Sequence, residues 1–374
     1  MSRLAAEPGS GLSGTLTVRS VDATLVVVPM RRALGTSVMS ITEAPLVLID
    51  LQTEEGITGR AYLFCYLEPA GRASIALAGE VSAVLAGTAA SPAAVRRALE
   101  ARFKLLGARG LVSAVLAGVD VACWDALAIA AGLPLARMLG SETRPTPAYN
   151  SNGLGLLEPQ AAADEALELI AEGFRAIKMR LGRPSGHDDL AAVRAVRTAI
   201  PPDVALMADY NQSLSRNAAR ERCRLLDDEG LYWIEEPVRH DDYAASAELA
   251  ALLLTPVQIG ENFAGPRAMS TALQHNASDL VMTDLERIGG VSGWLEAAAL
   301  AHAAGTEMSS HLYHEVSAHL LAATPTAHWI EYVDWADPIL EHPLKVAGGC
   351  VTPPDRPGTG LAWNADAVSH FRRG

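Results

Sequence analysis

From about residue 145 to residue 335, short apolar runs alternate with longer amphipathic segments. Each apolar run ends in a polar or charged residue, and these ends recur about every 20 to 31 residues. Such an interval fits one strand, one loop and one helix, as in a (β/α) barrel of the TIM type. The intervening segments, such as residues 159–174 and 187–200, carry apolar residues at three- and four-residue spacings, which predicts helices. The residues at the run ends are Tyr149 to Asn152, Lys178, Asp209, Glu235, Glu261, Asp284, His311 and Glu331.

The pattern differs before residue 140. Residues 16–29 and 45–66 are rich in Val, Leu, Ile and Tyr, which predicts β-strands with a turn near residues 54–56. Helical spacing follows from about residue 68 to 138, and Ser91 and Pro92 mark one helix start. We therefore expect a disordered tail at residues 1–14, an α+β capping domain at 15–140, a barrel at 141–340, and a C-terminal segment at 341–374 that packs back on the capping domain.

Residues 30–44, between the first two predicted strands, are too rich in Gly and Ser for a core and too apolar for a linker. We predict a loop that covers a ligand and faces it with apolar residues such as Leu34 and Ile41. An ordinary long hairpin loop is the alternative. Arg31 and Arg32 in this segment could meet a second carboxylate on a ligand.

Composition narrows the possible functions. The net charge of −13 argues against a nucleic-acid partner, because binding to phosphates needs clustered Lys and Arg. The four cysteines form no CxxC pair and no secretory signal is visible, which favours a cytoplasmic location. The longest apolar stretch, residues 111–136, contains Asp120 and Asp125, so we expect a buried helix rather than a membrane span.

Three acids end consecutive predicted strands. Asp209, Glu235 and Glu261 would point into one volume at the barrel mouth, and their oxygens are ligands that suit Mg²⁺. Glu236 and Asn211 could support these ligands by hydrogen bonds, although either could equally be structural. Without a cation, such a cluster of carboxylates would be costly.

The remaining run ends suggest proton transfer. Asp284 and His311 end adjacent strands, so Asp284 can orient the imidazole and raise its basicity. Lys178 and Arg180 lie two residues apart on one strand and therefore face the same side. Glu331 lies beside other carboxylates and an apolar wall, which predicts a raised pKa and a role as proton or hydrogen-bond donor.

Several longer motifs carry a family resemblance: APLVLIDL, WDAL, GFRAIK, DYNQSL, WIEEP, PVQIGEN, IGGVSGW and MSSHL with EVSAHLLAATPTAHW. From about Leu16 onward the chain resembles the enolase superfamily, and within it the mandelate racemase group. The resemblance implies a modified, enolase-like barrel, a homo-oligomer, and Mg²⁺ on Asp209, Glu235 and Glu261. It implies His311 with Asp284 as acid/base, and Glu331 and Lys178 on the substrate carboxylate. By the same resemblance, the substrate would contact Ser151, Asn211, Leu34, Ile41, Phe64, Tyr66, Leu312 and Val333.

One position departs from the family pattern. The racemase group has Lys-x-Lys on the second barrel strand, and this chain has Lys178-Met179-Arg180. Arginine does not normally deprotonate in proteins, so Arg180 is a poor general base but a good donor to an oxyanion. The change argues against racemisation by two bases and leaves a reaction based on His311 intact.

Three functions remain open on the sequence. The first is a racemase-like enzyme for a small 2-hydroxy carboxylate with an apolar or aromatic side chain, acting through an enediolate. The second is a sugar-acid dehydratase with His311 as single acid/base, which Arg180 favours. The third is a catalytically silent barrel with a structural or binding role, against which the intact ligand set argues.

Overall fold

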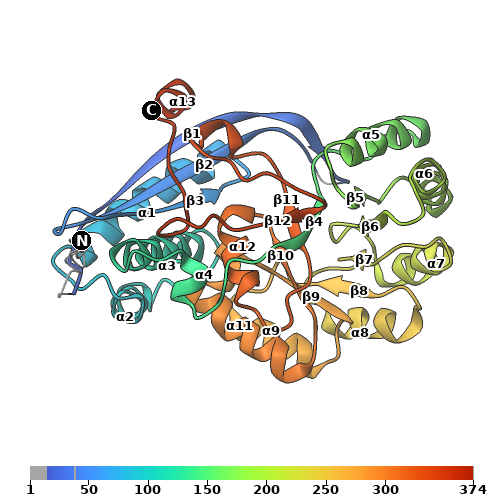
Figure 1. Ribbon diagram of the computed structural model, residues 1–374. Coiled ribbons are helices and arrows are strands. Elements are labelled where there is room, and N and C mark those ends of the chain that lie inside the picture. The colour runs from blue at the N-terminus through green and yellow to red at the C-terminus, as the bar shows by residue number, and fades with distance from the viewer. Residues whose placement is uncertain (1–14, 38, 374) are drawn as a thin grey trace, which may run out of the picture.

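The computed structural model describes residues 15–37 and 39–373. The tail predicted at residues 1–14 lies outside the described residues. The described chain forms a barrel of parallel strands surrounded by helices, and an α+β capping domain lies against the barrel (Figure 1). The capping domain comprises β1 (Val18–Gly35), β2 (Ser40–Thr53), β3 (Thr58–Phe64), α1 (Glu68–Leu85), α2 (Pro92–Phe103), α3 (Leu111–Ala130) and α4 (Leu135–Met138).

The barrel alternates strands with helices and is followed by a C-terminal segment. Its elements are β4 (Thr146–Asn150), α5 (Pro159–Ala171), β5 (Ala176–Arg180), α6 (Gly186–Ala199), β6 (Ala205–Asp209), α7 (Arg216–Leu226), β7 (Ile234–Glu235), α8 (Tyr243–Leu252), β8 (Val257–Ile259), α9 (Pro266–Gln274), β9 (Leu280–Asp284), α10 (Leu285–Ile288), α11 (Gly290–Ala304), β10 (Met308–His311), α12 (His314–Ala322) and β11 (Ile330–Tyr332). The C-terminal segment holds the 3₁₀ helix η1 (Asp337–Ile339), β12 (Cys350–Val351) and α13 (Ala365–Phe371).

The parallel strands pair in the order β10-β9-β8-β7-β6-β5-β4-β11. The sheet curls until its end strands meet, where the Ser310 amide donates to the Trp329 carbonyl at 3.0 Å. Every residue of β5 and of β9 is buried, as expected for parallel strands covered on both faces. This arrangement confirms the predicted modified TIM-type barrel.

The strand register brings the predicted site residues to one rim of the barrel. Arg180 pairs with Asp209 across β5 and β6, and Asp209 pairs with Glu235 across β6 and β7. On the other side of the barrel, His311 on β10 pairs with Asp284 on β9. Because parallel strands in register end together, all of these side chains lie at the same end of the barrel.

The capping domain has an antiparallel sheet, β1-β2-β3, and the first two strands are longer than the sequence indicated. Pairing continues through Leu34 with Ile41 and Gly35 with Ser40. The loop predicted at residues 30–44 is therefore wrong in its secondary structure: residues 30–35 and 40–44 belong to the two paired strands of a β-hairpin. The hairpin reaches from the capping domain across to α5 and β5 (Figure 1).

Helix α3 lies at the centre of the molecule. It is long and apolar enough to cross a membrane by length and composition, but 67% of its apolar window is buried inside the protein. Two acids of α3 connect it to other segments by hydrogen bonds. Asp120 accepts from the amide and hydroxyl of Ser292 on α11. Asp125 accepts from the amide of Arg60 on β3 and from the amide of Thr359 in the C-terminal segment. The buried helix expected at residues 111–136 is thus a core helix.

The C-terminal segment runs along the capping domain. The Trp363 indole donates to Asp50 on β2 at 2.9 Å, and the Arg373 amide donates to the Leu25 carbonyl at 2.9 Å. Helix α13 accordingly lies beside β1 (Figure 1). The four cysteines are free thiols.

Candidate active site

Three acids from neighbouring strands converge at the barrel mouth. Oxygens of Asp209, Glu235 and Glu261 all lie within 4.8 Å of one another, and the three side chains are buried. Asp209 and Glu235 end β6 and β7, whereas Glu261 comes two residues after β8. The intervening Gly260 has φ of 133°, and a Cβ there would meet the Met282 carbonyl oxygen at 2.2 Å. Glycine is therefore needed for the turn that presents Glu261.

The donor set of this cluster fits Mg²⁺. Magnesium takes carboxylate oxygens and keeps several waters or substrate oxygens, and the cluster offers three hard oxygen ligands on an open rim. Burial, together with Asp209, raises the pKa of the Glu235 carboxyl to about 8, although Lys178 acts in the opposite direction. This shift expresses the cost of crowding carboxylates in a buried site, which a divalent cation would relieve.

Neighbouring groups hold the three acids in place. The Trp233 indole and the Gln258 amide donate to Glu235 at 3.1 and 3.3 Å. The Asn211 amide and side chain donate to Asp209 at 2.7 and 3.0 Å. Such support fixes the orientation of metal ligands.

Glu236 stands beside the cluster without joining it. It accepts from the Asn262 side chain at 3.0 and 3.1 Å, and its backbone has the unusual φ of 38°. Burial and the nearby Glu261 raise its pKa well above the ordinary value. The supporting role predicted for Glu236 fits this position.

His311 and Asp284 form a tight pair on the other side of the mouth. The His311 Nδ1 lies 2.6 Å from an Asp284 oxygen, and Nε2 lies 3.3 Å from Glu261 and 3.7 Å from Glu331. Burial alone would lower the pKa of His311, but Glu261, Glu331 and Asp284 together raise it to about 9. The Asp284 carboxylate fixes Nδ1, and Nε2 points toward Glu261 and Glu331.

Lys178 lies between the acid cluster and Glu331. Its Nζ is 2.8 Å from Glu235, 2.9 Å from Glu331 and 3.3 Å from Asp209. The side chain is buried, yet these carboxylates keep its pKa well above the ordinary value. Lys178 is thus a fixed cation at the point where a substrate carboxylate would bind.

Arg180 is held by the loop that follows β4. Its guanidinium donates to the carbonyl of Ser151 at 2.9 Å, to the Ser151 hydroxyl at 2.9 Å and to the carbonyl of Gly153 at 3.4 Å. In all three bonds the guanidinium is the donor, as expected for a group that has donors and no acceptor. The geometry supports the interpretation of Arg180 as a fixed cation.

Ser151 lies behind the site rather than on its surface. Its hydroxyl donates to Glu331 at 2.6 Å and accepts from Arg180, and Ser151 is not among the residues that line the cavity. The substrate contact expected for Ser151 stays a prediction, and in this structure the side chain is engaged by Glu331 and Arg180. It positions Glu331 and Arg180.

Glu331 has the opposite pKa shift to the one predicted from the sequence. Burial would raise the pKa of its carboxyl, but Lys178, His311 and Arg180 lower it far below the ordinary value. The Leu312 amide also donates to Glu331 at 3.0 Å and stabilises the charged form. The sequence indicated the carboxylates around Glu331 but not how closely the cations approach it.

A cavity of about 220 Å³ opens between the barrel mouth and the β1–β2 hairpin. Of the predicted contacts, Leu34, Ile41, Tyr66, Asn211 and Leu312 line it. The other residues around it are Thr36, Met39, Lys178, Arg180, Asp209, Gln212, Glu261, Asn262, Arg287, His311, Glu331 and Trp335.

Two predicted pocket residues do not line this cavity. Phe64 is buried behind it, with ring centroids 4.4 Å from Tyr66 and 4.8 Å from Trp335, and Val333 is also buried. Trp335 lines the cavity, and the Phe64 ring packs against it. The resemblance that assigned Phe64 and Val333 to the pocket does not show which aromatic ring covers another.

Arg31 and Arg32 face away from the cavity. Arg31 binds Glu172 and Asp334, and Arg32 binds Glu172, Glu168 and Glu165. The prediction that they could meet a second carboxylate on a ligand is wrong, because both arginines already pair with acids in α5, directly after it, or after β11. Their role is to fix the hairpin to the barrel.

Sequence reasoning missed Arg287, which links the two halves of the site. Its guanidinium donates to the Glu261 carbonyl at 3.0 Å, to Asn262 at 2.9 Å and to the Tyr66 hydroxyl at 3.2 Å. The sequence signal for Arg287 was its position three residues after Asp284, in the helix that follows β9. Asn262 could have been found in the same way, because it directly follows Glu261.

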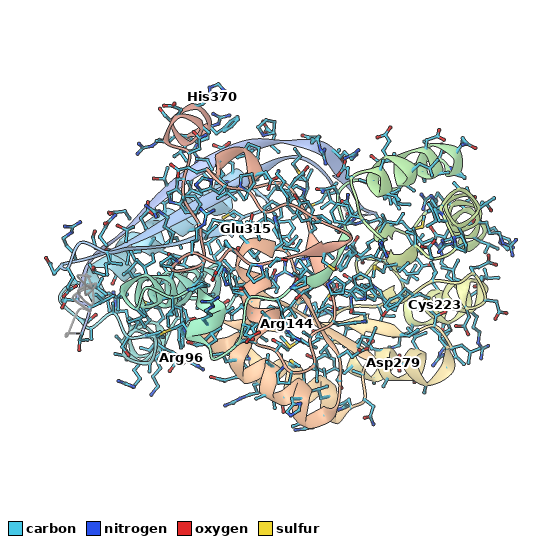
Figure 2. All side chains as sticks on the ribbon, in the orientation of Figure 1. Arg96, Arg144, Cys223, Asp279, Glu315 and His370 are labelled. Carbon is cyan, nitrogen blue, oxygen red and sulfur yellow. The ribbon has the colours of Figure 1, made fainter. Side chains whose placement is uncertain are left out.

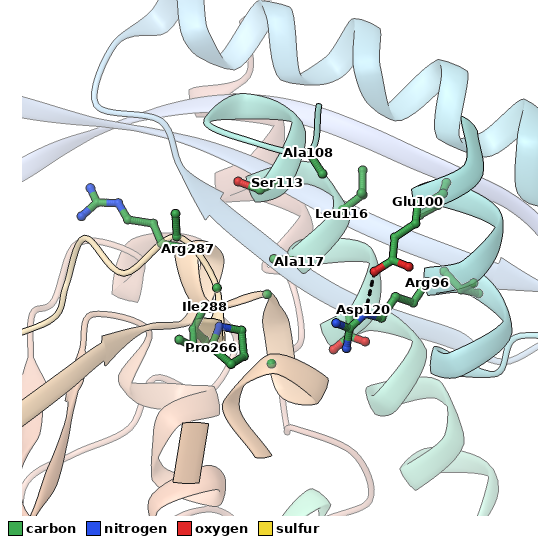
Figure 3. A pocket seen from close by; sticks show the side chains of 16 residues that line it. Arg96, Glu100, Ala108, Ser113, Leu116, Ala117, Asp120, Pro266, Arg287 and Ile288 are labelled. Carbon is green, nitrogen blue, oxygen red and sulfur yellow. Dashed lines mark hydrogen bonds and ion pairs between the residues drawn. The ribbon is translucent and has the colours of Figure 1, made fainter. Parts of the chain in front are cut away.

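A second cavity of about 180 Å³ lies between α2 and α3 of the capping domain and the start of α9 and α11. It is mostly apolar, with the ion pair of Arg96 and Glu100 at one side, and the Arg287 guanidinium points out of it (Figure 3). It contains none of the predicted catalytic residues.

Comparisons with known proteins agree with this arrangement. Residues 19–140 match the N-terminal domain of mandelate racemase and muconate lactonizing enzyme, and residues 161–367 match the enolase C-terminal domain-like family. The chain belongs to the enolase superfamily. Within this superfamily, the chain falls in the mandelate racemase group. Relatives of the chain are dehydratases, cycloisomerases and epimerases, so the protein is an enzyme of the isomerase or lyase type.

Members of the superfamily with solved structures are closely similar. An enolase from alpha proteobacterium bal199 with bound magnesium shares 45% identity and a TM-score of 0.94, over 96% of this chain and 100% of that one. An enolase from Bradyrhizobium, complexed with magnesium and mandelic acid, shares 41% identity and a TM-score of 0.92, over 97% and 100%. The L-talarate/galactarate dehydratase of Salmonella typhimurium is 32% identical over 87% of this chain and 82% of its own.

Proposed function

We propose that this enzyme removes the α-proton of a 2-hydroxy carboxylate with an apolar or aromatic side chain, with Mg²⁺ as cofactor. One observation carries the proposal. The cavity is lined by His311, Lys178 and the carboxylates of Asp209, Glu261 and Glu331, and the apolar part of its wall comes from Leu34, Met39, Ile41, Leu312 and Trp335. The magnesium in similar enolases and the mandelic acid in the Bradyrhizobium protein support it.

Asp209, Glu235 and Glu261 would hold the Mg²⁺ ion. When bound, the ion supplies positive charge that stabilises the negative charge on the substrate carboxylate during deprotonation. The protein contributes a second cation, because the Lys178 ammonium already contacts Glu235 and Glu331 from the same side. Fixed charges of this kind usually contribute more than the base itself.

His311 is the group that would take the α-proton, because Mg²⁺ held by Glu261 would offset part of the negative charge that raises the pKa of the imidazole. Its Nε2 faces the cavity, and Asp284 on Nδ1 stabilises the imidazolium that forms. Glu331 adjoins the place of the substrate carboxylate. An incoming negative charge raises the pKa of a neighbouring carboxyl, so substrate binding would offset the lowered pKa of Glu331 and allow it to hold a proton there.

The walls of the cavity favour an apolar side chain. Polar groups at the edge are already engaged: Gln212 accepts from the His240 amide, and Asn262 binds Glu236 and Arg287. Leu34, Ile41 and Trp335, with Leu312 and Met39, remain to contact a substrate. The buried Asn211 Oδ1 accepts no hydrogen bond from the described residues 15–37 and 39–373, so it is available to a 2-hydroxyl group.

A second candidate function is dehydration of a sugar acid. The fixed, charged Arg180 favours it, because this reaction needs only His311, which would take the α-proton and then protonate the departing β-hydroxyl. The similarity to an L-talarate/galactarate dehydratase points the same way. The engaged polar lining of the cavity is less suited to a polyol chain.

A screen of mandelates and acid sugars, with Mg²⁺ and in heavy water, distinguishes these functions. Deuterium uptake or racemisation on aromatic 2-hydroxy acids without 2-keto acid formation supports the first proposal. Formation of 2-keto acids from acid sugars alone would support the second. No Mg²⁺-dependent exchange with any 2-hydroxy acid would contradict both.

A further inference from the structure

A second group of ionisable residues lies away from the barrel mouth. His314 and Glu315 start α12, and Asp337 starts η1. One possible ligand atom from each of the three lies within 4.8 Å of the others, and the His314 Nε2 is 3.6 Å from the Glu315 Oε1. Figure 2 shows Glu315 in the middle of the molecule, between the capping domain and the barrel.

The free hydrogen-bonding atoms of this group are arranged as a set of ligands. The Tyr62 hydroxyl donates to Glu315 Oε2 at 2.7 Å, and Lys345 donates to Asp337 Oδ2 at 3.3 Å. The opposite oxygens, Glu315 Oε1 and Asp337 Oδ1, are buried and have no hydrogen-bond partner among the described residues 15–37 and 39–373. Each carboxylate is thus oriented through one oxygen and leaves the other available.

The environment of the His314 imidazole is the strongest indication that this group binds a ligand. The side chain is completely buried, and among the residues that the structure describes no hydrogen bond reaches Nδ1 or Nε2. Its ring packs against Tyr332 with centroids 4.4 Å apart, which fixes its plane. Buried polar atoms left without partners are costly, so a ring with two of them indicates a missing ligand.

We propose that His314, Glu315 and Asp337 bind a divalent transition-metal ion of the zinc class. One imidazole nitrogen and two carboxylate oxygens match such an ion, because imidazole favours zinc and its neighbours over magnesium and calcium. Bond lengths of about 2.0–2.2 Å place ligand atoms about 3–4 Å apart. The observed separations need only a small contraction to reach this spacing.

The charges around the group support a cation. Glu315 and Asp337 bring two acids to the group, and the side chain of Glu315 is buried. The cation that contacts Asp337, Lys345, is largely exposed, so a divalent ion would compensate the buried negative charge.

The ion would have a structural effect. It would join the start of α12, which follows the strand of His311, to η1, which follows the strand of Glu331. Through Tyr62 on β3 the same site contacts the capping domain. Binding at this junction stabilises the relative position of the two domains.

Metal analysis tests this proposal without relying on activity. The full-length protein is stripped with chelator, given excess Mg²⁺ to fill the barrel mouth, mixed with Zn²⁺, freed of unbound metal and analysed for zinc. We expect about one Zn²⁺ per chain in the wild type and in the control His187→Gln, which replaces an exposed histidine of α6. In His314→Gln, we expect less than about a tenth of this amount.

A second variant and a second probe cover the case in which His314→Gln does not fold. Asp337→Asn changes a partly exposed ligand and should also reduce the retained zinc at least tenfold. Visible absorption of Co²⁺ added to the Mg²⁺-loaded wild type should show a low-coordinate nitrogen and oxygen site. The proposal would be overturned if the wild type retained no zinc, or if both site variants retained as much zinc as the wild type. A buried water would then be the occupant of the site.

Discussion

At the scale of single residues, the two sides of the site differ in their ability to move a proton. His311 has Nδ1 held by Asp284 and its ring on the wall of the cavity, whereas every observed hydrogen bond of Arg180 is donated by its guanidinium. Because arginine does not normally deprotonate in proteins, we propose that a fixed cation stands where a two-base racemase has its second base. On this proposal the enzyme would remove the α-proton from one face of the substrate only.

Replacing Arg180 with lysine should restore part of the second base. A lysine beside the Lys178 ammonium would have a lowered pKa and could reach the neutral form at working pH. We expect Arg180→Lys to raise α-proton exchange from the slowly exchanging enantiomer at least about tenfold. Deuterium uptake from each pure enantiomer, followed by NMR, measures this.

Arg180→Met is the matched control for that experiment. It removes the charge without adding a base, so exchange through His311 should fall but remain measurable. If Arg180→Lys and Arg180→Met behaved alike on the slow enantiomer, the role assigned to position 180 would be wrong.

The proposed metal ligands can also be tested by single substitutions. Glu235→Gln removes a charge from the centre of the cluster while preserving the donors from Trp233 and Gln258 to one oxygen. We expect activity to fall at least about 100-fold and Mg²⁺ binding by calorimetry to weaken, with an unchanged circular dichroism spectrum. Asp203→Asn, at an exposed acid, is the control. Full activity of the wild type in excess chelator would exclude the proposed metal role.

At the scale of elements, the β1–β2 hairpin is the cover of the site. It carries Leu34 and Ile41 into the cavity, and Arg31 and Arg32 fix its outer side to α5. The hairpin is therefore held from the barrel as well as from the capping domain. Its position should determine how tightly the substrate is enclosed.

Arg32→Gln tests this attachment. The variant loses contacts to Glu172, Glu168 and Glu165, of which Arg32 to Glu172 is the shortest at 2.9 Å. Partly exposed pairs of this kind contribute about 1 kcal/mol, so KM should rise about fivefold with kcat changed less than twofold. Arg19→Gln on the exposed face of β1 is the control, and equal KM values in the two variants would contradict the assignment.

Helix α12 carries a buried histidine that links stability to pH. The Ala136 amide donates to His319 Nδ1 at 3.2 Å, and Nε2 lies 3.1 Å from the Thr359 carbonyl. Burial lowers the pKa of His319 to about 4, from about 6.5 in the unfolded chain. Its contribution to stability is therefore fully present above pH 6.5 and is lost as pH falls through 4.

This linkage predicts the behaviour of His319→Gln. The His319 contribution amounts to about 3 kcal/mol of unfolding free energy between pH 7 and pH 4 in the wild type. The variant should start from a lower stability at pH 7, because its hydrogen bonds are weaker, but should lose less as the pH falls. Urea unfolding at several pH values measures both slopes, and identical slopes would contradict the prediction.

At the scale of the whole molecule, the barrel and most of its rim could be predicted from the sequence. Asp209, Glu235 and His311 end apolar runs, and parallel strands in register bring such ends together. The buried position of α3 followed from Asp120 and Asp125 within an apolar stretch. The local pattern of apolar and polar residues was sufficient to predict these features, because each of them depends on a single strand or helix.

Other features depend on contacts between distant parts of the chain and could not be predicted in this way. The low pKa of Glu331 depends on how closely Lys178 and Arg180 approach it. The exclusion of Phe64 from the cavity depends on the Trp335 ring, and the roles of Arg31 and Arg32 depend on acids of α5. Residues 30–35 and 40–44 form strands because pairing between Leu34 and Ile41 overrode the turn-like composition.

The central claim is that His311 alone removes the α-proton of a 2-hydroxy carboxylate in the presence of Mg²⁺. Deuterium uptake from the separate enantiomers of mandelate in heavy water tests it most directly. We predict Mg²⁺-dependent uptake from one enantiomer, uptake slower by orders of magnitude from the other, and none in His311→Asn. Equal uptake from both enantiomers by the unmodified protein, or uptake that persists in His311→Asn, would contradict the account.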